Sequence, residues 1–365
     1  MTAEACFVPG EPWLDDRGVH INAHGGGVLF HGGAYYWFGE HKISGKAGNV
    51  AHVGVHCYSS TDLTSWRDEG IALAVSDDSE SDIVRECVLE RPKVIYNALT
   101  ETFVMWFHLE LKGQGYAAAR SGVAVSSSPT GPYAFCDSFR PNAGHWPLNA
   151  TEEQKAPLED PPYLRNRSVS GGPNAATPAN GFFRRDHLGG QMARDMTLFV
   201  DDDGTGYHIY SSEENSTLHI SELTPDFQRP SGRYVRVFEK RWMEAAAICK
   251  RQGRYYLLAS GCTGWAPNEA RSAVADSIWG PWEELGNPCV GINPMNGLGQ
   301  EKTFGGQSTS ILPVEGLRDA YIAMFDIWCP EDAIDGRYVW LPIVFSEEGM
   351  KISWRDRWDL AGFGT

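Results

Sequence analysis

The sequence predicts an all-β chain that folds as a single domain, a five-bladed β-propeller spanning residues 1–365. Three observations support this prediction. Short stretches rich in Tyr, Trp, Phe, Val and Ile are bounded by Gly, Asp and Ser, which is the chemistry of strands and turns. The sequence has no long Leu/Ala/Glu/Lys runs at helical spacing. A turn followed by an aromatic-rich strand recurs five times, as in repeat architectures.

The five copies of this pattern mark one hairpin in each blade. They are GGAYYWFGEH (32–41), TETFVMWFHL (100–109), GTGYHIYSSE (204–213), GRYYLLASGC (253–262) and RDAYIAMFDI (318–327). Each copy has a strand upstream and a further strand and turn downstream. We therefore expect blades at about 20–75, 85–137, 192–235, 240–286 and 303–358. The alternative is a β-sandwich or β-helix with coincidental hairpins, although sandwiches seldom contain five matched units.

Residues 138–191 break the spacing of the repeats. This stretch is rich in Pro, Gly, Asn and Arg, and it is too long for an ordinary connection and too aperiodic for a blade. Its aromatic residues Trp146, Tyr163, Phe182 and Phe183 favour an ordered segment. We expect a lid over one face of the propeller.

The composition excludes several classes of partner. The formal net charge is −16 and no block of Lys and Arg offsets it, so we expect neither a nucleic acid nor a membrane as partner. The N-terminus has no export signal, so we expect a cytoplasmic protein, or a secreted one if the sequence lacks its signal. The eight scattered cysteines are expected to be mostly free, buried thiols, and the protein a monomer.

Each blade is expected to begin with an innermost strand whose first residue is polar. These residues are His24, Glu90, Asp195, Glu244 and Gln307. Because the inner strands of a propeller line its central axis, the five side chains should meet at one mouth. Each precedes an apolar run, so chance explains the pattern poorly. The sequence therefore predicts a functional site in the central funnel.

Each of these residues also has an alternative without a functional role, which for Glu244 is a solvated side chain. Asp195 follows Arg194 directly, and such neighbours can form a local ion pair. Glu90 and Arg91 are a second pair of this kind. His24 and Gln307 are residue types that often serve as scaffold hydrogen-bonding groups.

Glu244 has the strongest sequence signal for a catalytic role. It has no adjacent cation and precedes three alanines, Ala245, Ala246 and Ala247, whose small side chains are expected to leave room for a sugar ring. Metal binding has weaker support. The run Asp201–Gly204 is better explained by a hairpin turn than by calcium, and the histidines match no ligand motif. We expect neither a metal nor another cofactor.

Carboxyl groups that face each other across a narrow funnel suit the hydrolysis of a glycosidic bond. One protonates the leaving oxygen while a second group activates water or attacks. A carboxyl group in a partly apolar pocket among other carboxylates has a raised pKa, as a general acid needs. Glu244 fits this role, with Asp195 as its ionised neighbour. Trp265 follows the fourth hairpin and is expected to stack on a sugar, unless it packs between blades.

Six motifs resemble glycoside hydrolase family 43, and within it the exo-β-1,3-galactanase branch. They are INAHGGG, YYWFGEHK, ERPKVIYN, RDMTLFVDDDG, SGCTGWAPN and FGGQST, and the resemblance covers nearly the whole chain. It implies that Glu244 is the general acid and that Asp195 tunes its pKa. Ala246 stands where the family usually has proline.

The resemblance also implies an unusual base. The family's first-blade Asp is absent, because INAHGGG places Asn22 and His24 in that region. In the galactanase branch an amide side chain is proposed to take over, which is Gln307 here, with Glu90 as the other essential carboxylate. The amide would have to act as an imidic tautomer or only position the water. Direct attack by water inverts the configuration of the sugar.

The resemblance further implies the release of galactose from the non-reducing end of β-1,3-galactan, as in arabinogalactan degradation. We expect the sugar also to contact Asn22, His24, Glu40, Arg194 and Trp265. One alternative is another family 43 activity, an α-L-arabinofuranosidase or a β-xylosidase, although the missing Asp counts against it. The other is a non-catalytic carbohydrate-binding propeller, which the same missing base makes possible.

Overall fold

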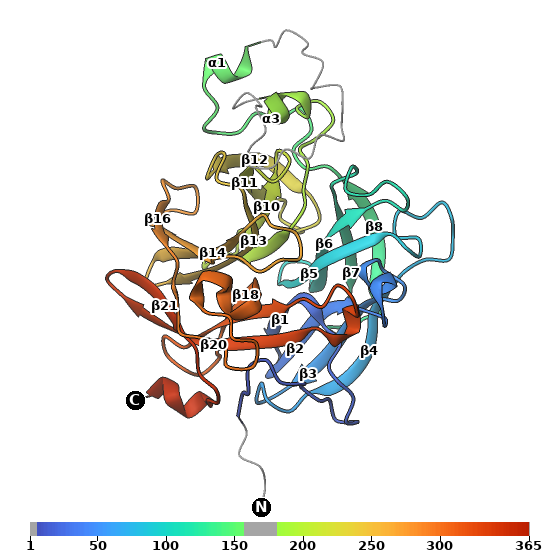
Figure 1. Cartoon of the computed structure of the whole chain (residues 1–365). Coiled ribbons are helices and arrows are strands. Elements are labelled where there is room, and N and C mark those ends of the chain that lie inside the picture. Colours follow the sequence, from blue (N-terminus) through green and yellow to red (C-terminus); the bar gives the residue numbers. More distant parts are fainter. Residues whose placement is uncertain (1–5, 157–180, 365) are drawn as a thin grey trace, which may run out of the picture.

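A computed structural model describes residues 6–156 and 181–364 of the chain. Five sheets are arranged around a central axis, each with four antiparallel strands that are consecutive in sequence, and one sheet has an additional strand that pairs in parallel (Figure 1). The prediction of an all-β, five-bladed propeller is confirmed. No helix among the described residues is long and apolar enough to cross a membrane.

Four blades contain four strands, and the fifth contains five. The first two blades comprise β1 (His24–His31), β2 (Ala34–His41), β3 (Gly54–Ser60) and β4 (Arg67–Ala74), then β5 (Val88–Asn97), β6 (Thr102–Glu110), β7 (Arg120–Ser126) and β8 (Ala134–Phe139). The third and fourth comprise β9 (Met196–Val200), β10 (Gly206–Ser212), β11 (Thr217–Leu223) and β12 (Pro230–Val237), then β13 (Met243–Arg251), β14 (Arg254–Gly261), β15 (Arg271–Ala275) and β16 (Glu283–Gly286). The fifth comprises β17 (Cys289–Val290), β18 (Gln307–Pro313), β19 (Tyr321–Ile327), β20 (Arg337–Ser346) and β21 (Gly349–Ser353).

The helical elements are short. Among the described residues, the α-helices are α1 (Glu152–Lys155) and α3 (Gly181–Arg185), and the 3-10 turns are η1 (Lys46–Asn49), η2 (Gln300–Gly305), η3 (Ala333–Asp335) and η4 (Leu360–Gly364).

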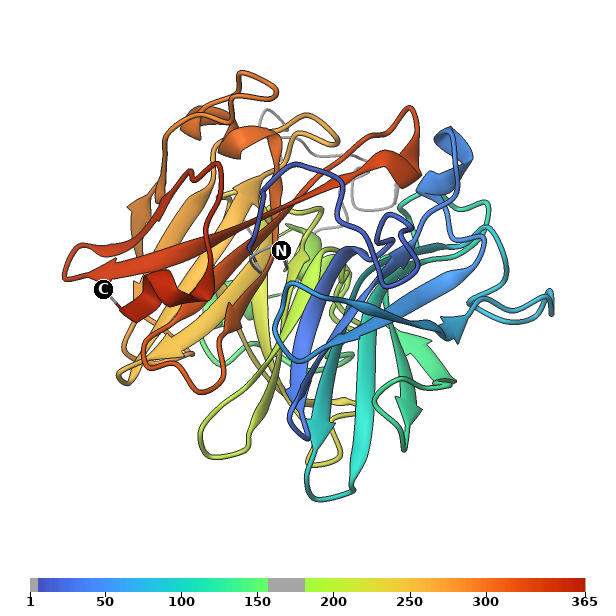
Figure 2. The ribbon, with the colours of Figure 1, turned by 90° about the horizontal axis from the view of Figure 1, so that it is seen from below.

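The propeller closes through its innermost strands. β1, β5, β9, β13 and β18 each contact the next in this order, and β18 returns to contact β1. Near the junction of the first and fifth blades, the segment before β1 meets the segment after β21, where Phe7 bridges to Trp358 (Figure 2). The beginnings of the inner strands therefore share one mouth of the axis.

Large aromatic side chains fill the space between the blades. Trp37 of the first blade contacts Trp340 and Tyr338 of the fifth at ring-centroid distances of 4.8 and 4.6 Å, and all three side chains are buried. Burial of one such side chain contributes about 3 kcal/mol. An aromatic residue of the first repeated hairpin, Trp37, thus packs in the core together with residues of β20.

The acidic run before β10 forms a hairpin turn. The Asp201 N–H donates to the Thr205 carbonyl oxygen at 2.9 Å, and Gly204 has a φ of 84°. The Asp201 carboxylate contacts Lys250 Nζ at 2.5 Å. A turn with a paired carboxylate accounts for this motif, in line with the sequence interpretation.

The described ends of the predicted lid, 138–156 and 181–191, lie beside the outer strands of the third blade (Figure 1). Asn142 Nδ2 donates to Ser221 Oγ at 2.7 Å, and the Leu148 N–H donates to the Tyr234 carbonyl oxygen at 2.7 Å. Phe183 is buried under the Arg236 guanidinium. The rest of the predicted lid, 157–180, lies outside the described residues.

Candidate active site

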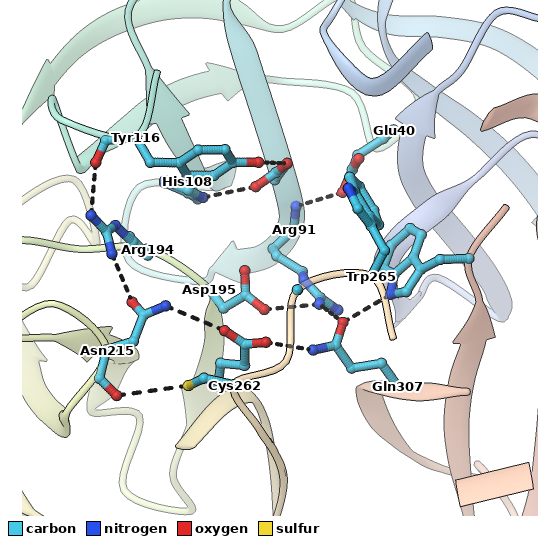
Figure 3. Close-up of a pocket in the computed structure, with 14 residues that line it drawn as sticks. Glu40, Arg91, His108, Tyr116, Arg194, Asp195, Asn215, Cys262, Trp265 and Gln307 are labelled. Atoms are coloured by element: carbon cyan, nitrogen blue, oxygen red, sulfur yellow. Dashed lines mark hydrogen bonds and ion pairs between the residues drawn. The ribbon is translucent and has the colours of Figure 1, made fainter. Parts of the chain in front are cut away.

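A pocket of about 330 Å³ lies at the mouth where the inner strands begin (Figure 3). It is lined by side chains from all five blades. The lining residues are Glu40, Glu90, Arg91, His108, Tyr116, Arg194, Asp195, Asn215, Glu244, Cys262, Gly264, Trp265, Gln307 and Trp328. The structure thus brings together Glu90, Asp195, Glu244 and Gln307, the four residues predicted to be catalytic, with Glu40, Arg194 and Trp265.

Backbone irregularities aim these side chains into the pocket. The pairing register shifts just after the first residues of β1, β5, β13 and β18. The residues after His24, Glu90 and Glu244 have φ values of 65°, 57° and 57°. Such a β-bulge turns a side chain out of the regular alternation of a strand. The sequence contains no clear signal for these bulges, because two of the three left-handed residues are Arg91 and Ala245 rather than glycine.

Glu244 is half-buried between two amide side chains. Its Oε1 accepts a hydrogen bond from Gln307 Nε2 at 3.1 Å, and its Oε2 accepts one from Asn215 Nδ2 at 3.3 Å. Burial raises the pKa of Glu244, and the nearby charge of Asp195 raises it further, to about 8. At neutral pH this carboxyl group therefore carries a proton that it can donate.

The three alanines after Glu244 do not make room for a sugar. Ala245, Ala246 and Ala247 are buried inside the fourth blade, and none of them lines the pocket. The expectation that they leave space beside Glu244 is wrong. The β-bulge after Glu244 lets its side chain face the pocket while the alanines that follow face the interior of the blade.

Glu90 belongs to a chain of buried charges. His108 donates from Nδ1 to Glu90 Oε2 at 3.1 Å and from Nε2 to Glu110 Oε1 at 3.0 Å, while the Tyr116 hydroxyl donates to Glu90 Oε1 at 2.7 Å. Burial alone raises the pKa of Glu90, but the hydrogen bond and charge of His108 outweigh it and lower that pKa to about 2. Glu90 is therefore ionised at neutral pH.

Glu90, His108 and Asp195 form the one group of potential metal ligands found among the described residues, with ligand atoms within 4.8 Å of one another. His108 does not suit this role. Both of its ring nitrogens already donate hydrogen bonds to carboxylates. Burial by itself lowers the pKa of His108, but Glu110 and Glu90 raise it to about 9, and a metal-bound histidine must be neutral.

Replacement of His108 tests this chain of charges through the pH dependence of stability. A pKa raised from 6.5 to about 9 stabilises the fold fully below pH 6.5, and this stabilisation is lost as pH rises through 9. We therefore expect His108→Gln to destabilise the protein by about 3 kcal/mol less at pH 10 than at pH 6, as measured by urea unfolding. A loss of stability that does not change with pH would contradict a protonated His108.

Arg91 connects the pocket residues of different blades. Its Nη2 lies 2.8 Å from Asp195 Oδ2 and donates to Gln307 Oε1 at 2.6 Å, and its guanidinium lies 5.2 Å from the ring centroid of Trp328. The local ion pairs considered from the sequence are replaced by longer-range ones. Arg91 pairs with Asp195 rather than with Glu90, and Arg194 pairs with Glu214 at 3.1 Å.

Glu40, in β2 of the first blade, also lines the pocket. Its Oε2 lies 2.6 Å from Lys42 Nζ, and its Oε1 accepts from the Arg91 N–H at 3.0 Å. A Cβ atom on Gly25 would lie 2.3 Å from Glu40 Oε1. A side chain at position 25 therefore cannot enter the pocket while Glu40 keeps this position.

Two predicted substrate-binding residues lie outside the pocket lining. His24 is fully buried and stacks on Tyr338, and burial together with the charge of Lys42 lowers its pKa well below the usual value. Asn22 pairs with the backbone of Lys42, donating to its carbonyl oxygen and accepting from its N–H at 2.8 Å each. For these two residues the structure corrects the expectation of direct contact, because both point into the core beneath the pocket.

Two tryptophans stand at the pocket mouth. Trp265 is 40% exposed, and its ring meets that of Trp328 edge-on at 5.7 Å. Trp328 Nε1 donates to Gln307 Oε1 at 2.8 Å. Trp265 is therefore available to a ligand rather than packed between blades. Trp328 was not predicted, since one tryptophan in an aromatic-rich sequence carries no positional signal.

A strained turn between β10 and β11 places Asn215 in the pocket lining. The sequence did not predict this residue as part of the site. Glu213, Glu214 and Asn215 have φ values of 53°, 56° and 66°, a left-handed conformation that costs of the order of 1 kcal/mol for each residue. Buried charges hold the turn. Glu213 contacts Arg236 at 2.6 Å, and Glu214 contacts Arg194 at 3.1 Å. His108, Tyr116 and Cys262 were also missed, because they reach the pocket from second strands and loops.

A pocket on a propeller axis that holds a protonated carboxyl group, Glu244, together with an ionised one, Glu90, is the arrangement of a glycoside hydrolase. A sequence profile of glycosyl hydrolases family 43 matches residues 174–306. The chain belongs to this family, because it is 50% identical to a family 43 β-1,3-galactosidase solved with galactodeoxynojirimycin, with a TM-score of 0.90. The alignment covers 97% of this chain and 100% of that one.

More distant solved structures agree with this assignment. An exo-β-1,3-galactanase from Clostridium thermocellum is 34% identical, with a TM-score of 0.76 and coverage of 97% of this chain and 66% of that one. One from Phanerochaete chrysosporium, solved with galactose, is 30% identical, with a TM-score of 0.75 and coverage of 97% and 68%. No curated protein gave a significant match.

Proposed function

We propose that this glycoside hydrolase releases galactose, one residue at a time, from the non-reducing end of β-1,3-galactan or its oligosaccharides, with inversion of configuration. The observation that carries the proposal is Glu244, whose pKa of about 8 keeps a proton available in the same pocket as the ionised Glu90. The β-1,3-galactosidase and exo-β-1,3-galactanases that resemble this chain support galactose as the sugar.

The proposed reaction uses the pocket residues as follows. Water adds to the anomeric carbon as the bond from that carbon to the leaving oxygen breaks, and Glu244 gives its proton to this oxygen. The proton lost by the water goes to solvent, from which Glu244 is protonated again. Asp195, held by Arg91, keeps negative charge beside the acid and the developing positive charge of the sugar.

The shape of the pocket supports exo action. A volume of about 330 Å³ is at the small end for ligand pockets and suits a terminal sugar with part of its neighbour. Arg91 joins Asp195 and Gln307 of two other blades across the pocket, and we propose that only a terminal residue of a polymer enters beside them. Trp265 at the mouth lies where the rest of the chain would extend.

Product analysis by NMR on linear β-1,3-galactan tests the proposal. We expect free galactose as the sole early product, appearing first as the α-anomer because a β-linkage is inverted. Appearance of the β-anomer would contradict inversion, and early oligosaccharides would contradict exo action. Binding of galactobiose without release of galactose would identify a carbohydrate-binding propeller. Arabinose or xylose released from matching substrates, with β-1,3-galactan left intact, would identify another family activity.

A further inference from the structure

Both oxygens of the Glu244 carboxyl group accept hydrogen bonds from side-chain amides. Gln307 Nε2 donates to Oε1 at 3.1 Å and Asn215 Nδ2 donates to Oε2 at 3.3 Å. The two amides, which are labelled in Figure 3, come from different blades and contact different oxygens of the carboxyl group. This arrangement fixes the plane of the carboxyl group without placing a cation on it.

The orientation of the Gln307 amide is fixed by its other neighbours. Oε1 accepts from Arg91 Nη2 at 2.6 Å and from Trp328 Nε1 at 2.8 Å, and both of these groups can only donate. Nε2 also donates to Ser260 Oγ at 2.9 Å, while the Ser260 hydroxyl donates to the Gly261 carbonyl oxygen. Both lone pairs of the amide oxygen and both hydrogens of its nitrogen are therefore used.

This hydrogen-bond pattern favours the ordinary amide. An imidic tautomer would carry a hydrogen on the oxygen that faces Arg91 and Trp328, where two N–H groups already point at it. It would also lose one of the two hydrogens that the nitrogen gives to Glu244 and Ser260. The surroundings of Gln307 are thus those of a group that orients the acid.

Asn215 is placed with comparable precision. It ends the left-handed turn of Glu213 and Glu214, which is held by buried ion pairs to Arg236 and Arg194. Arg194 Nη1 also lies 3.4 Å from Asn215 Oδ1, so the amide oxygen faces the cation and the NH₂ group faces Glu244. A strained turn kept in place by buried charges indicates that the position of its last side chain matters.

We propose that Gln307 and Asn215 form an amide clamp that positions the acid Glu244, and that Gln307 acts through Glu244 rather than by taking a proton from the attacking water. The inference rests on the proposed function, because it assigns partners to the acid of that reaction. Amide donors suit this task, since they orient a carboxyl group and, unlike a directly bound cation, leave it able to keep its proton.

Two substrates separate the two roles of Gln307. β-1,3-Galactobiose needs a protonated leaving group, whereas 2,4-dinitrophenyl β-galactoside does not. We expect Gln307→Met and Asn215→Gly each to lower kcat on galactobiose by about 10- to 100-fold and to change kcat on the aryl galactoside less than fivefold. The loss on galactobiose should not exceed the ~10²–10⁴-fold that a general acid contributes in full. Glycine at position 215 retains the left-handed backbone, and methionine has the length of glutamine.

Two further readouts exclude a general loss of structure. In a Glu244→Gln background, Gln307→Met should cause no additional loss on galactobiose, since the acid through which it acts is gone. The hydrogen bond from the Gln307 amide lowers the pKa of Glu244. In Gln307→Met the basic limb of the pH–rate profile on galactobiose should therefore move to higher pH. A collapsed pocket that admits water would move it to lower pH. Gln300→Met, at an exposed glutamine, is the matched control.

The base role of Gln307 has a different signature. Equal losses on both substrates for Gln307→Met, with recovery by added azide or formate, would overturn the proposal. So would an additional loss in the Glu244→Gln background. Failure of the wild-type protein to release galactose from galactobiose would instead overturn the proposed function, so the two failures are distinguishable.

Discussion

Glu244→Gln is expected to lower kcat on β-1,3-galactobiose by about 10³-fold or more, because glutamine has no proton to give to the leaving oxygen. The loss on 2,4-dinitrophenyl β-galactoside should be far smaller, since dinitrophenolate leaves without protonation. In the wild-type enzyme, activity on galactobiose should fall as pH rises through about 8, where Glu244 loses its proton. Initial rates on both substrates across pH 5–10 measure these effects.

Glu244 should also limit the stability of the wild-type protein at high pH. Its folded pKa of about 8 lies above the usual value of 4.5, so the folded state binds the proton more tightly than the unfolded state. By linkage, stability decreases as pH rises from 4.5 to 8. At pH 9 the Glu244→Gln variant should therefore be more stable than the wild type, whereas Glu283→Gln, at an exposed position in the same blade, should have the stability of the wild type.

Equal losses of activity on both substrates in Glu244→Gln would remove Glu244 from the acid role.

Arg91→Met is expected to reduce both stability and activity strongly. The Arg91 side chain is 5% exposed and neutralises Asp195, so its loss leaves that carboxylate unpaired in the pocket, at a cost of about 3 kcal/mol. It also removes the donor that holds Gln307 Oε1. We expect a lower thermal midpoint and a lower kcat on galactobiose.

The cause of the Arg91 effect can be separated from loss of packing. Arg91→Met combined with Asp195→Asn should regain part of the lost stability, because no unpaired charge remains. Arg254→Met breaks an exposed ion pair with Asp276 and should change stability by less than about 1 kcal/mol. A double variant less stable than Arg91→Met alone would show that the charge of Asp195 is not what Arg91 compensates.

The sequence predicted the fold because the signals of a propeller are local. Each blade is a meander of consecutive strands, so turn residues and aromatic hairpins reveal the unit, and five similar units imply closure. The same symmetry placed Glu90, Asp195, Glu244 and Gln307 correctly at one mouth, since each stands at the beginning of an inner strand. His24 has the same position in its strand, yet it is buried behind the pocket, where it stacks on Tyr338.

What the sequence determined by itself is therefore the five blades and the group of polar residues at the start of their inner strands. The tertiary structure alone decided which partners these residues have: Arg91 with Asp195, Glu90 with His108, and Glu244 with the amides of Asn215 and Gln307. The physical reason is distance along the chain. Periodicity reports which face of a strand a residue occupies, whereas ion pairs and hydrogen bonds join blades that no local pattern relates. Those contacts set the pKa of Glu244 and with it the chemistry of the pocket.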